Sequence, residues 1–314
     1  MSRIAVIGAG YVGLTTAACF ARLGHDVVAA DIDEERVAAL SRGEVPILEQ
    51  GLDELVREGL DGGRLSFVVG AATAAADCEF AYLCVPTPQG DDGSADLSYI
   101  EAALGRADVF VVSNPEFLRE GSAVHDFLHP DRIVIGSDHQ AAAIRVASLY
   151  LRVQAPLIVT DPASAETIKY ASNAFLATKI SFINAIANLC EAVGADVGDV
   201  VLGMGYDPRI GFEFLKPGPG WGGSCFPKDT RALVHIAETA GYDFDLLRGV
   251  VTVNEEQFGR VADKVEAAAG ATPPSSRASR SPPTPTRRAR RPTCSSCSPS
   301  GTTSAGSTTT RSPA

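Results

Sequence analysis

The sequence has no excess of positive charge, no long apolar run and no recognisable export signal. Its 27 basic residues are outnumbered by 38 acidic ones, and the net charge of −11 argues against nucleic-acid binding, which relies on Lys and Arg at phosphates. No uninterrupted apolar run approaches the roughly 20 residues of a membrane helix. The apolar stretch within Met1 to Gly10 is too short for a signal peptide. We therefore expect a cytoplasmic protein without a membrane span.

Cysteine offers no disulfide or metal framework. The chain has 7 cysteines at irregular spacing, and an odd number leaves at least one thiol unpaired. In a reducing compartment most of them would be small buried residues, with one reactive exception. Cys294 and Cys297 have the spacing of a metal-binding pair, but no second pair lies near them. We therefore predict no metal site.

The composition indicates a globular body followed by a different tail. A length of 314 residues suggests two domains, and 45% hydrophobic residues exclude fibrous and wholly disordered chains. Residues 271–314 contain seven arginines but no acid, Leu, Ile, Val, Met, Phe, Tyr or Trp, so we predict that they are disordered. Without those seven arginines, 20 basic residues face 38 acidic ones, a net charge of −18 for the body. The tail is either an anion-binding segment or a stretch without function, such as a frame-shifted translation.

The first 31 residues follow the order strand, glycine turn, helix, strand, acid. Residues 4–7 read as a buried strand, the pattern Gly8–Gly13 follows, and 11–23 read as a helix before a second strand at 26–30. Glycines in such a turn let a pyrophosphate approach the helix N-terminus, and an acid after the second strand accepts hydrogen bonds from a ribose. Asp31 fills that place, and its charge would repel a 2′-phosphate. We predict a dinucleotide site that prefers NAD over NADP; the alternative is a glycine turn without a ligand.

Two further strands are expected, each followed by a candidate site loop. Phe80–Val85 precedes Thr87, which would reach a cofactor at the carboxyl end of the sheet. Val109–Val112 is predicted to be a strand before the loop 114–121, which carries two acids and an arginine. That loop is either part of a site or a solvated turn.

A long helix is predicted next. Asp161 and Pro162 have the character of an N-cap and a first helical residue, and no further glycine or proline occurs before Gly194. Lys169 and Asn173 are four residues apart and share one face of this helix, as part of a site or of a solvated surface. An apolar stripe at helical spacing is expected to pack inward, and its members are Ile168, Phe175, Leu176, Ile180, Ile183 and Ala187.

The segment 211–229 is rich in glycine and contains Cys225. A cysteine is reactive where it is partly exposed beside a cation, and Lys228 follows it closely. The alternative is a buried structural cysteine, against which the lack of aliphatic neighbours argues.

Taken together, these motifs resemble the UDP-glucose/GDP-mannose dehydrogenase family. The resemblance covers about residues 1–270 and is carried by GAGYVG at 8–13, DID at 31–33, CVPTP at 84–88, NPEFLREG at 114–121, KYASNAF at 169–175 and FLKPGPGWGGSCFPKD at 214–229. The FLKPG form of the last motif favours the UDP-glucose branch. The resemblance implies oxidation of a nucleotide sugar, such as UDP-glucose to UDP-glucuronate, in polysaccharide biosynthesis, with NAD as cofactor and a homodimer formed through the long helix.

The resemblance also implies a role for each motif residue. NAD would be bound by Gly8, Gly10, Tyr11, Val12, Gly13, Asp31, Arg36, Thr87, Glu120 and Lys228. The nucleotide sugar would be bound by Phe117, Leu118, Arg119, Glu120, Lys169, Asn173, Phe214, Leu215, Lys216, Pro217, Gly218 and Gly222. Catalysis would fall to Cys225, Lys169, Asp229, Glu120 and Asn173. Cys225 would capture the aldehyde as a thiohemiacetal and then a thioester.

Two departures from the family are expected to matter. About thirty residues, including a strand and a threonine loop, have no counterpart between Leu104 and Gly105, and the tail stands where the family has a third nucleotide-binding domain. We therefore expect a gap in the sheet, an open substrate site and slow or absent turnover. Alternatives to the UDP-glucose activity are an inactive remnant that binds NAD at most and a dehydrogenase for GDP-mannose or UDP-N-acetylmannosamine.

The expected fold is α/β. A Rossmann-type, doubly wound parallel sheet in residues 1–160 is followed by a helical central domain at 161–270 with one long connecting helix, and by the basic tail at 271–314.

Overall fold

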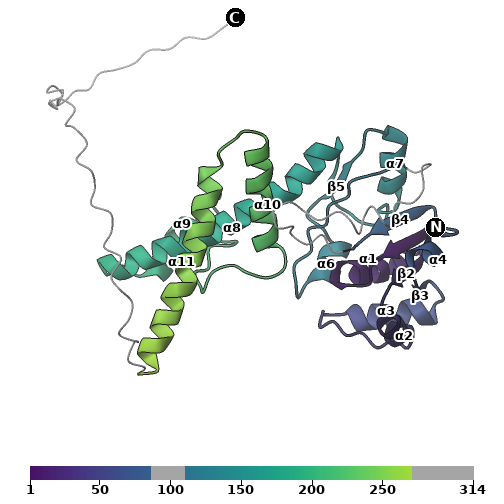
Figure 1. Cartoon of the computed structure of the whole chain (residues 1–314), viewed down its shortest axis with the longest axis horizontal. Helices are drawn as coiled ribbons and strands as arrows, with labels where there is room; N and C mark the ends of the chain where they lie inside the picture. The colour runs from purple at the N-terminus through teal and green to yellow at the C-terminus, as the bar shows by residue number, and fades with distance from the viewer. Residues whose placement is uncertain (86–109, 271–314) are drawn as a thin grey trace, which may run out of the picture.

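The computed structural model describes residues 1–85 and 110–270. The chain forms a sheet-containing part and a helical part, and a long helix, α8, runs from one to the other (Figure 1). The first part consists of β1 (Arg3–Ile7), α1 (Tyr11–Arg22), β2 (Asp26–Asp31), α2 (Glu34–Ser41), α3 (Leu52–Asp61), β3 (Leu65–Val69), α4 (Ala71–Ala75), β4 (Phe80–Leu83), α6 (Ala123–Leu128), β5 (Ile133–Gly136), α7 (Gln140–Ser148) and β6 (Leu157–Thr160). The second consists of α8 (Pro162–Val193), α9 (Val197–Gly205), α10 (Phe226–Thr239) and α11 (Asp245–Ala268).

The strands are parallel but lie in two separate sheets. One has the order β3-β2-β1-β4, and the other pairs β5 with β6. Central strand β1 pairs with both neighbours, so that Ile4 lies opposite Val27 of β2 and Phe80 of β4. Within the described residues no strand joins β4 of the larger sheet to β5 of the smaller one.

The strand predicted at Val109–Val112 is wrong for the part of it that the structure describes. Residues 110–112 are in no strand, and Ser113 makes one isolated antiparallel bridge to Gly136 at the end of β5. Phe110 and Val111 are 64% and 67% exposed, so their apolar side chains are not covered by a sheet neighbour. A strand needs a partner along its length, and this segment reaches β5 at a single residue.

Helix α1 covers one face of the larger sheet because nearly all its residues are small or apolar. Phe20 of α1 is fully buried at the centre of an aromatic cluster. Its ring centroid lies 4.9 Å from that of Tyr82, 5.1 Å from Phe127 and 5.4 Å from Tyr150. This cluster ties the last turn of α1 to β4, to α6 and to the segment that follows α7.

The boundaries predicted for α8 are confirmed. The Asp161 side chain accepts a hydrogen bond from the Ser164 N–H at 2.8 Å, and Gly194 ends the helix with a positive φ of 76°. Ile183 is buried against the other helices as expected. Phe175, placed in the same inward stripe, is instead 65% exposed, because α10 and α11 cover only part of the circumference of α8.

Helix α8 contains no uninterrupted apolar run of about 20 residues, but over Pro162–Val193 it is long and apolar enough to cross a membrane by length and composition alone. The same helix buries the polar side chains of Asn173, Ser181 and Asn184 and packs against α10 and α11. These contacts make α8 the central helix of the second part of the chain.

Candidate active site

The dinucleotide turn is built around the Asp31 carboxylate. Its oxygens accept hydrogen bonds from the Ala9 N–H at 2.8 Å and from the Asp33 N–H at 3.1 Å, and Arg36 Nη1 lies 3.2 Å away. Burial alone would raise the pKa of Asp31, but these backbone hydrogen bonds and the Arg36 guanidinium outweigh it and bring the pKa below its usual value. Asp31 is therefore ionised at the end of β2, where it both shapes the turn and opposes a second negative charge.

The turn also leaves room for a cofactor in front of α1. A Cβ at Gly13 would lie 1.8 Å from the Gly8 carbonyl oxygen, so glycine is required where helix and strand meet. A Cβ at Gly10 would meet nothing within 4 Å. The first turn of α1 has no side-chain cap and no acid, so no side chain competes there with an anionic ligand for its N–H groups. Gly8, Gly10, Tyr11, Val12 and Gly13 thus fit a pyrophosphate; Thr87 lies outside the described residues.

Cys225 lies at the N-terminus of α10. It is the N-cap residue of this helix and is half-buried, and its thiol is free. The residue therefore lies at the positive end of the helix dipole, a setting that favours reactive cysteines. Lys228, the cation expected near this cysteine, lies in the first turn of the same helix.

Asp229 connects Lys228 to the long helix. Lys228 Nζ donates to one carboxylate oxygen at 2.5 Å, and Asn173 Nδ2 donates to the other at 2.6 Å. Asp229 is 2% exposed and Asn173 8% exposed. Burial would lower the pKa of Lys228, but its hydrogen bond to Asp229 raises it above the usual value. Three of the predicted site residues are thus linked by hydrogen bonds, with Asp229 and Asn173 buried and Lys228 partly exposed.

The loop 114–121 brings a further carboxylate to this cysteine. Ser224 Oγ donates to Glu120 Oε1 at 3.1 Å and lies 3.5 Å from Cys225 Sγ. Glu120 belongs to the sheet-containing part, whereas Ser224 and Cys225 belong to the helical part. This contact between the two parts thus links Glu120 through Ser224 to Cys225.

Lys169 has a different immediate partner from Asn173, although both lie on α8. Lys169 Nζ donates to the Glu116 carbonyl at 2.6 Å and to its carboxylate at 2.9 Å. The Arg132 guanidinium carbon lies over the Phe117 ring, 3.7 Å from the ring centroid. Lys169 Nζ lies 5.4 Å from the same centroid. Glu116 and Arg132 were not assigned from the sequence, since only the folded chain shows which side chains surround Lys169.

Arg119 and Leu118 are engaged within their own domain. Arg119 donates through its backbone N–H, Nε and Nη2 to the buried Asp126 carboxylate at 2.9, 3.0 and 2.6 Å. The Leu118 N–H donates to Glu116 Oε2 at 2.7 Å. The Arg119 guanidinium is thus neutralised by Asp126, and its contact in this structure is one that shapes the loop.

Part of the predicted substrate segment surrounds a cavity of 460 Å³. Phe214, Lys216, Pro217 and Gly218 line it, together with Ile180, Glu213, Pro219 and Gly220, which were not assigned from the sequence. Ile180 was missed although it lies two helical turns beyond Asn173 on α8. Leu215 is instead in the core at 2% exposure, and Gly222 is not among the lining residues. Phe214 has a positive φ of 61°, which is uncommon for a bulky side chain and is often found at functional sites.

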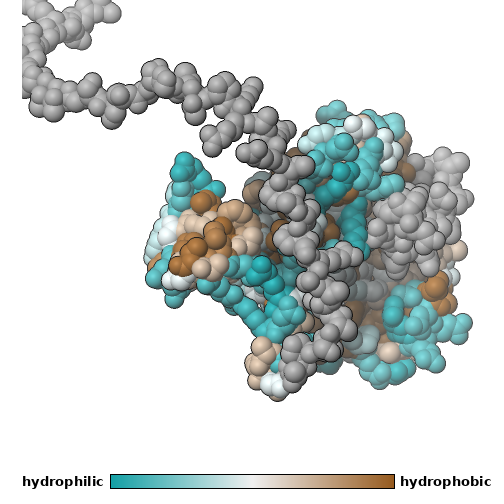
Figure 2. Space-filling view, turned by 60° about the vertical axis from the view of Figure 1, so that its left-hand side comes forward, coloured by the Kyte–Doolittle hydropathy of each residue, from teal (hydrophilic) through white to brown (hydrophobic). Residues whose placement is uncertain are grey.

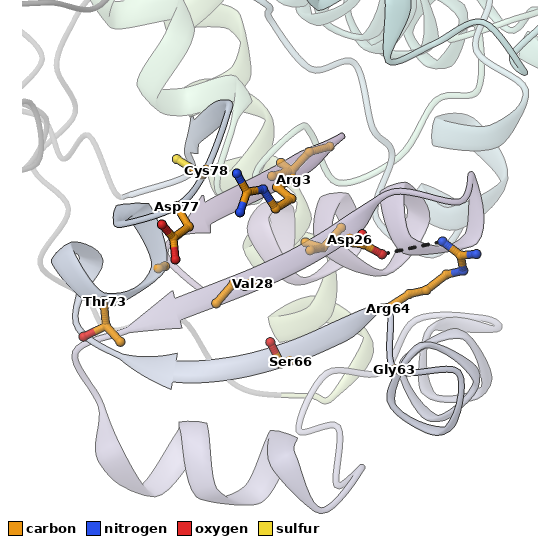
Figure 3. Close-up of a pocket in the computed structure, with 12 residues that line it drawn as sticks. Arg3, Asp26, Val28, Gly63, Arg64, Ser66, Thr73, Asp77 and Cys78 are labelled. Carbon is orange, nitrogen blue, oxygen red and sulfur yellow. Dashed lines mark ion pairs between the residues drawn. The ribbon is translucent and has the colours of Figure 1, made fainter. Parts of the chain in front are cut away.

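A second cavity, of 250 Å³, lies at the opposite end of the larger sheet. Figure 3 shows Arg3, Asp26 and Arg64 at the starts of β1, β2 and β3, with the ion pair of Arg64 and Asp26 at 3.6 Å. Ligands of open α/β sheets bind at the carboxyl ends of the strands. This cavity is therefore separate from the dinucleotide turn.

A dinucleotide turn joined by a long helix to a cysteine at a second helix N-terminus defines a nucleotide-dependent dehydrogenase fold. The chain belongs to the UDP-glucose/GDP-mannose dehydrogenase family. The family's NAD-binding domain matches residues 2–107 and 104–154, and its central domain matches 163–256. NAD is the cofactor of this N-terminal domain. The two matched segments of the domain overlap at residues 104–107.

Characterised relatives extend this assignment. The chain is 47% identical over 302 residues to the UDP-glucose 6-dehydrogenase TuaD of Bacillus subtilis, covering 84% of this chain and 65% of that protein. It is 46% identical to a UDP-glucose 6-dehydrogenase of Rhizobium meliloti, covering 85% and 71%. A UDP-glucose dehydrogenase structure from Pyrobaculum islandicum matches with a TM-score of 0.83 at 39% identity, covering 86% and 72%. The chain thus spans about two thirds of the length of these relatives.

Proposed function

We propose that this chain is an NAD-dependent dehydrogenase that oxidises UDP-glucose to UDP-glucuronate through Cys225. The observation that carries the proposal is the placement of Cys225 at the start of α10. The same helix carries Lys228 and Asp229, which is hydrogen-bonded to Asn173 of α8, and Ser224 links the cysteine to Glu120 of the other domain. The names of the relatives at 46–47% identity support UDP-glucose as the substrate.

The proposed steps balance as a four-electron oxidation. NAD held at the glycine turn would supply the hydride acceptor, and two NAD molecules, exchanged between the two oxidation steps, would be reduced for each sugar, while the C6 hydroxyl proton would pass to a nearby base. The Cys225 thiolate adds to the aldehyde, and the thiohemiacetal loses the second hydride to become a thioester. Water then cleaves the C–S bond, which releases the carboxylate and regenerates the thiolate.

The surrounding residues hold the reacting atoms in this scheme. Asn173 and Lys169 stabilise the oxygen that becomes negative when the thiol adds or water attacks. Asp229, fixed by Asn173 and Lys228, and Glu120 position the water and take its proton. Phe214, Lys216 and Gly218 contact the nucleotide sugar in the cavity next to α8.

The test is NADH formation by the whole chain with UDP-glucose, UDP-N-acetylmannosamine and GDP-mannose. We expect UDP-glucose to give the fastest rate, with two NADH for each uronate formed. Cys225→Ser should reduce acid formation at least about a hundredfold, because a serine alkoxide is far harder to form than a thiolate. Normal uronate production by Cys225→Ser would remove the cysteine from the mechanism, and preference for another nucleotide sugar would change the assigned substrate.

A second candidate is a chain that binds NAD but does not turn over. The observation that favours it is the match of the family's NAD-binding domain in two segments that meet at 104–107, where the sequence lacks a family strand and loop. NAD binding measured by calorimetry, without NADH from any of the three sugars, would support this candidate over the first.

We also propose a homodimer formed through α8 in the cytoplasm. Phe175, Phe182 and Leu189 recur at intervals of seven residues on α8 and are 65%, 50% and 55% exposed. Such spacing places them on one face, as in paired helices, and Figure 2 shows apolar surface on the helical part turned toward the viewer. The five cysteines of the described residues are free, and a catalytic thiol requires a reducing compartment such as the cytoplasm.

A further inference from the structure

Glu49 is a buried carboxylate that none of the roles above includes. It lies between α2 and α3 and is 8% exposed. Oε2 accepts hydrogen bonds from the Tyr11 hydroxyl at 2.5 Å and from the Gly121 N–H at 2.8 Å, and Oε1 accepts one from the Ala123 N–H at 2.9 Å. Its bonding partners are therefore one side chain and two backbone amides, all distant in sequence.

These partners belong to two functional loops. Tyr11 is the first residue of α1, directly after the glycine turn, and its hydroxyl also lies 3.3 Å from the Arg119 carbonyl. Gly121 directly follows Glu120, whose carboxylate accepts from Ser224 beside Cys225. A continuous set of hydrogen bonds thus leads from the dinucleotide turn through Glu49 to the loop that contacts the cysteine.

The protonation of Tyr11 agrees with this arrangement. Burial and then the hydrogen bond to Glu49 raise the pKa of Tyr11 well above its usual value. The hydroxyl therefore keeps its proton at neutral pH and donates a hydrogen bond to Glu49.

We propose that Glu49 is a positioning residue that couples the dinucleotide turn to the loop carrying Glu120. The hydrogen bonds from the Gly121 and Ala123 amides to the Glu49 carboxylate fix the position of residues 121–123. The hydrogen bond from the Tyr11 hydroxyl holds the same carboxylate against α1. Binding of the cofactor's phosphates at the start of α1 then orders the Glu120 loop as well. The inference rests on the proposed function, because it takes the glycine turn as the NAD site and Cys225 as the reacting thiol.

Amide hydrogen exchange of the whole chain, read at Gly121 and Ala123, tests the coupling without turnover. Glu49→Gln should speed exchange at both amides about tenfold, because an amide side chain has a single acceptor oxygen for three donors. Tyr11→Phe leaves Glu49 in place and should speed exchange a few-fold. Glu58→Gln, an exposed carboxylate on α3, is the matched control and should change neither amide.

Saturating NAD supplies the second readout. It should slow exchange at Gly121 and Ala123 about threefold in the unmodified chain, and Glu49→Gln should remove this response while NAD still binds. Unchanged exchange in Glu49→Gln without NAD, or a full NAD response in that variant, would overturn the inference. A chain that binds no NAD contradicts the proposed cofactor role alone, and the exchange rates without NAD then decide on Glu49.

Discussion

At the scale of single residues, Asp31 and Arg36 together control the end of β2. The carboxylate shapes the turn through Ala9 and Asp33 and also pairs with Arg36. Since the guanidinium is 41% exposed, it becomes available to another anion when Asp31 is removed. Cofactor preference at this site is therefore a balance between one repelling and one attracting charge.

We predict that Asp31→Ala relaxes the preference for NAD over NADP by about tenfold or more, because the 2′-phosphate no longer meets a carboxylate. Titration of both cofactors measures the ratio of dissociation constants. Asp31→Asn should give the same direction while keeping an acceptor for the Ala9 N–H, and Glu35→Ala on α2 is the control. Tighter binding of NADP by the unmodified chain would contradict the prediction.

His25 gives the fold a pH dependence. It is 7% exposed, its Nε2 lies 3.0 Å from the Leu149 carbonyl, and its Nδ1 accepts from the Ser2 N–H at 3.3 Å. With Nδ1 accepting and Nε2 donating, the ring is neutral. Burial lowers the pKa of His25, partly offset by the Leu149 carbonyl.

The sign follows from linkage. Below about pH 6.5, the ordinary histidine value, the unfolded chain binds this proton more readily than the folded chain. The stabilising effect of neutral His25 is complete above that pH and is lost as the pH falls toward the lower pKa of the folded state. We expect the melting temperature to decrease as the pH is lowered from 7.5 to 5.5, and to decrease less steeply in His25→Gln. Exposed His129→Gln should leave the slope unchanged, and an equal slope in all three proteins would refute the role of His25.

At the scale of elements, the glycine-rich loop before α10 is held by α8 and α11. The Asn254 side chain of α11 accepts from the Trp221 N–H at 2.8 Å and donates to the Trp221 carbonyl at 2.9 Å. Trp221 Nε1 donates to Ser181 Oγ of α8 at 2.8 Å. The loop that leads to Cys225 thus depends on two helices that are distant from it in sequence.

Asn254→Ala should lower the free energy of unfolding by about 2–3 kcal/mol, because it leaves two buried backbone groups of Trp221 without partners. Chemical denaturation followed by the fluorescence of the single tryptophan measures this loss. Glu255→Gln, whose side chain is 63% exposed, is the neighbouring control and should stay within about 0.5 kcal/mol. If Asn254→Ala lowered the free energy of unfolding by less than about 0.5 kcal/mol, the loop would be held by other contacts.

At the scale of the whole molecule, the proposed homodimer rests on the exposed apolar side chains of Phe175, Phe182 and Leu189 on α8. We expect the chain to sediment as a dimer and Phe182→Glu to convert it to a monomer, because a charge at the centre of an apolar interface stays unpaired. Leu151→Glu is the control, since Leu151 is 84% exposed but lies on the sheet-containing part. An unmodified chain that sediments as a monomer, or a dimeric Phe182→Glu, would contradict the proposed interface.

The sequence by itself determined the local elements. The strand, glycine turn and helix at the N-terminus were predicted because buried-strand composition, glycine spacing and a helix stop agree over 31 residues. The ends of α8 were predicted because Asp161, Pro162 and Gly194 act on their own backbone. The grouping of Asp229 with Asn173 was implied by family resemblance and not by any local signal.

Only the tertiary structure decided which segments meet. Lys169 pairs with Glu116 across 53 residues, and Ser224 reaches Glu120 across 104 residues, so neither contact leaves a local pattern. The same is true of the failed strand at 110–112 and of outward-facing Phe175, since both depend on which neighbours pack beside them. Propensity and capping act within a few residues, whereas a site shared by two domains is fixed by the packing that brings those domains together.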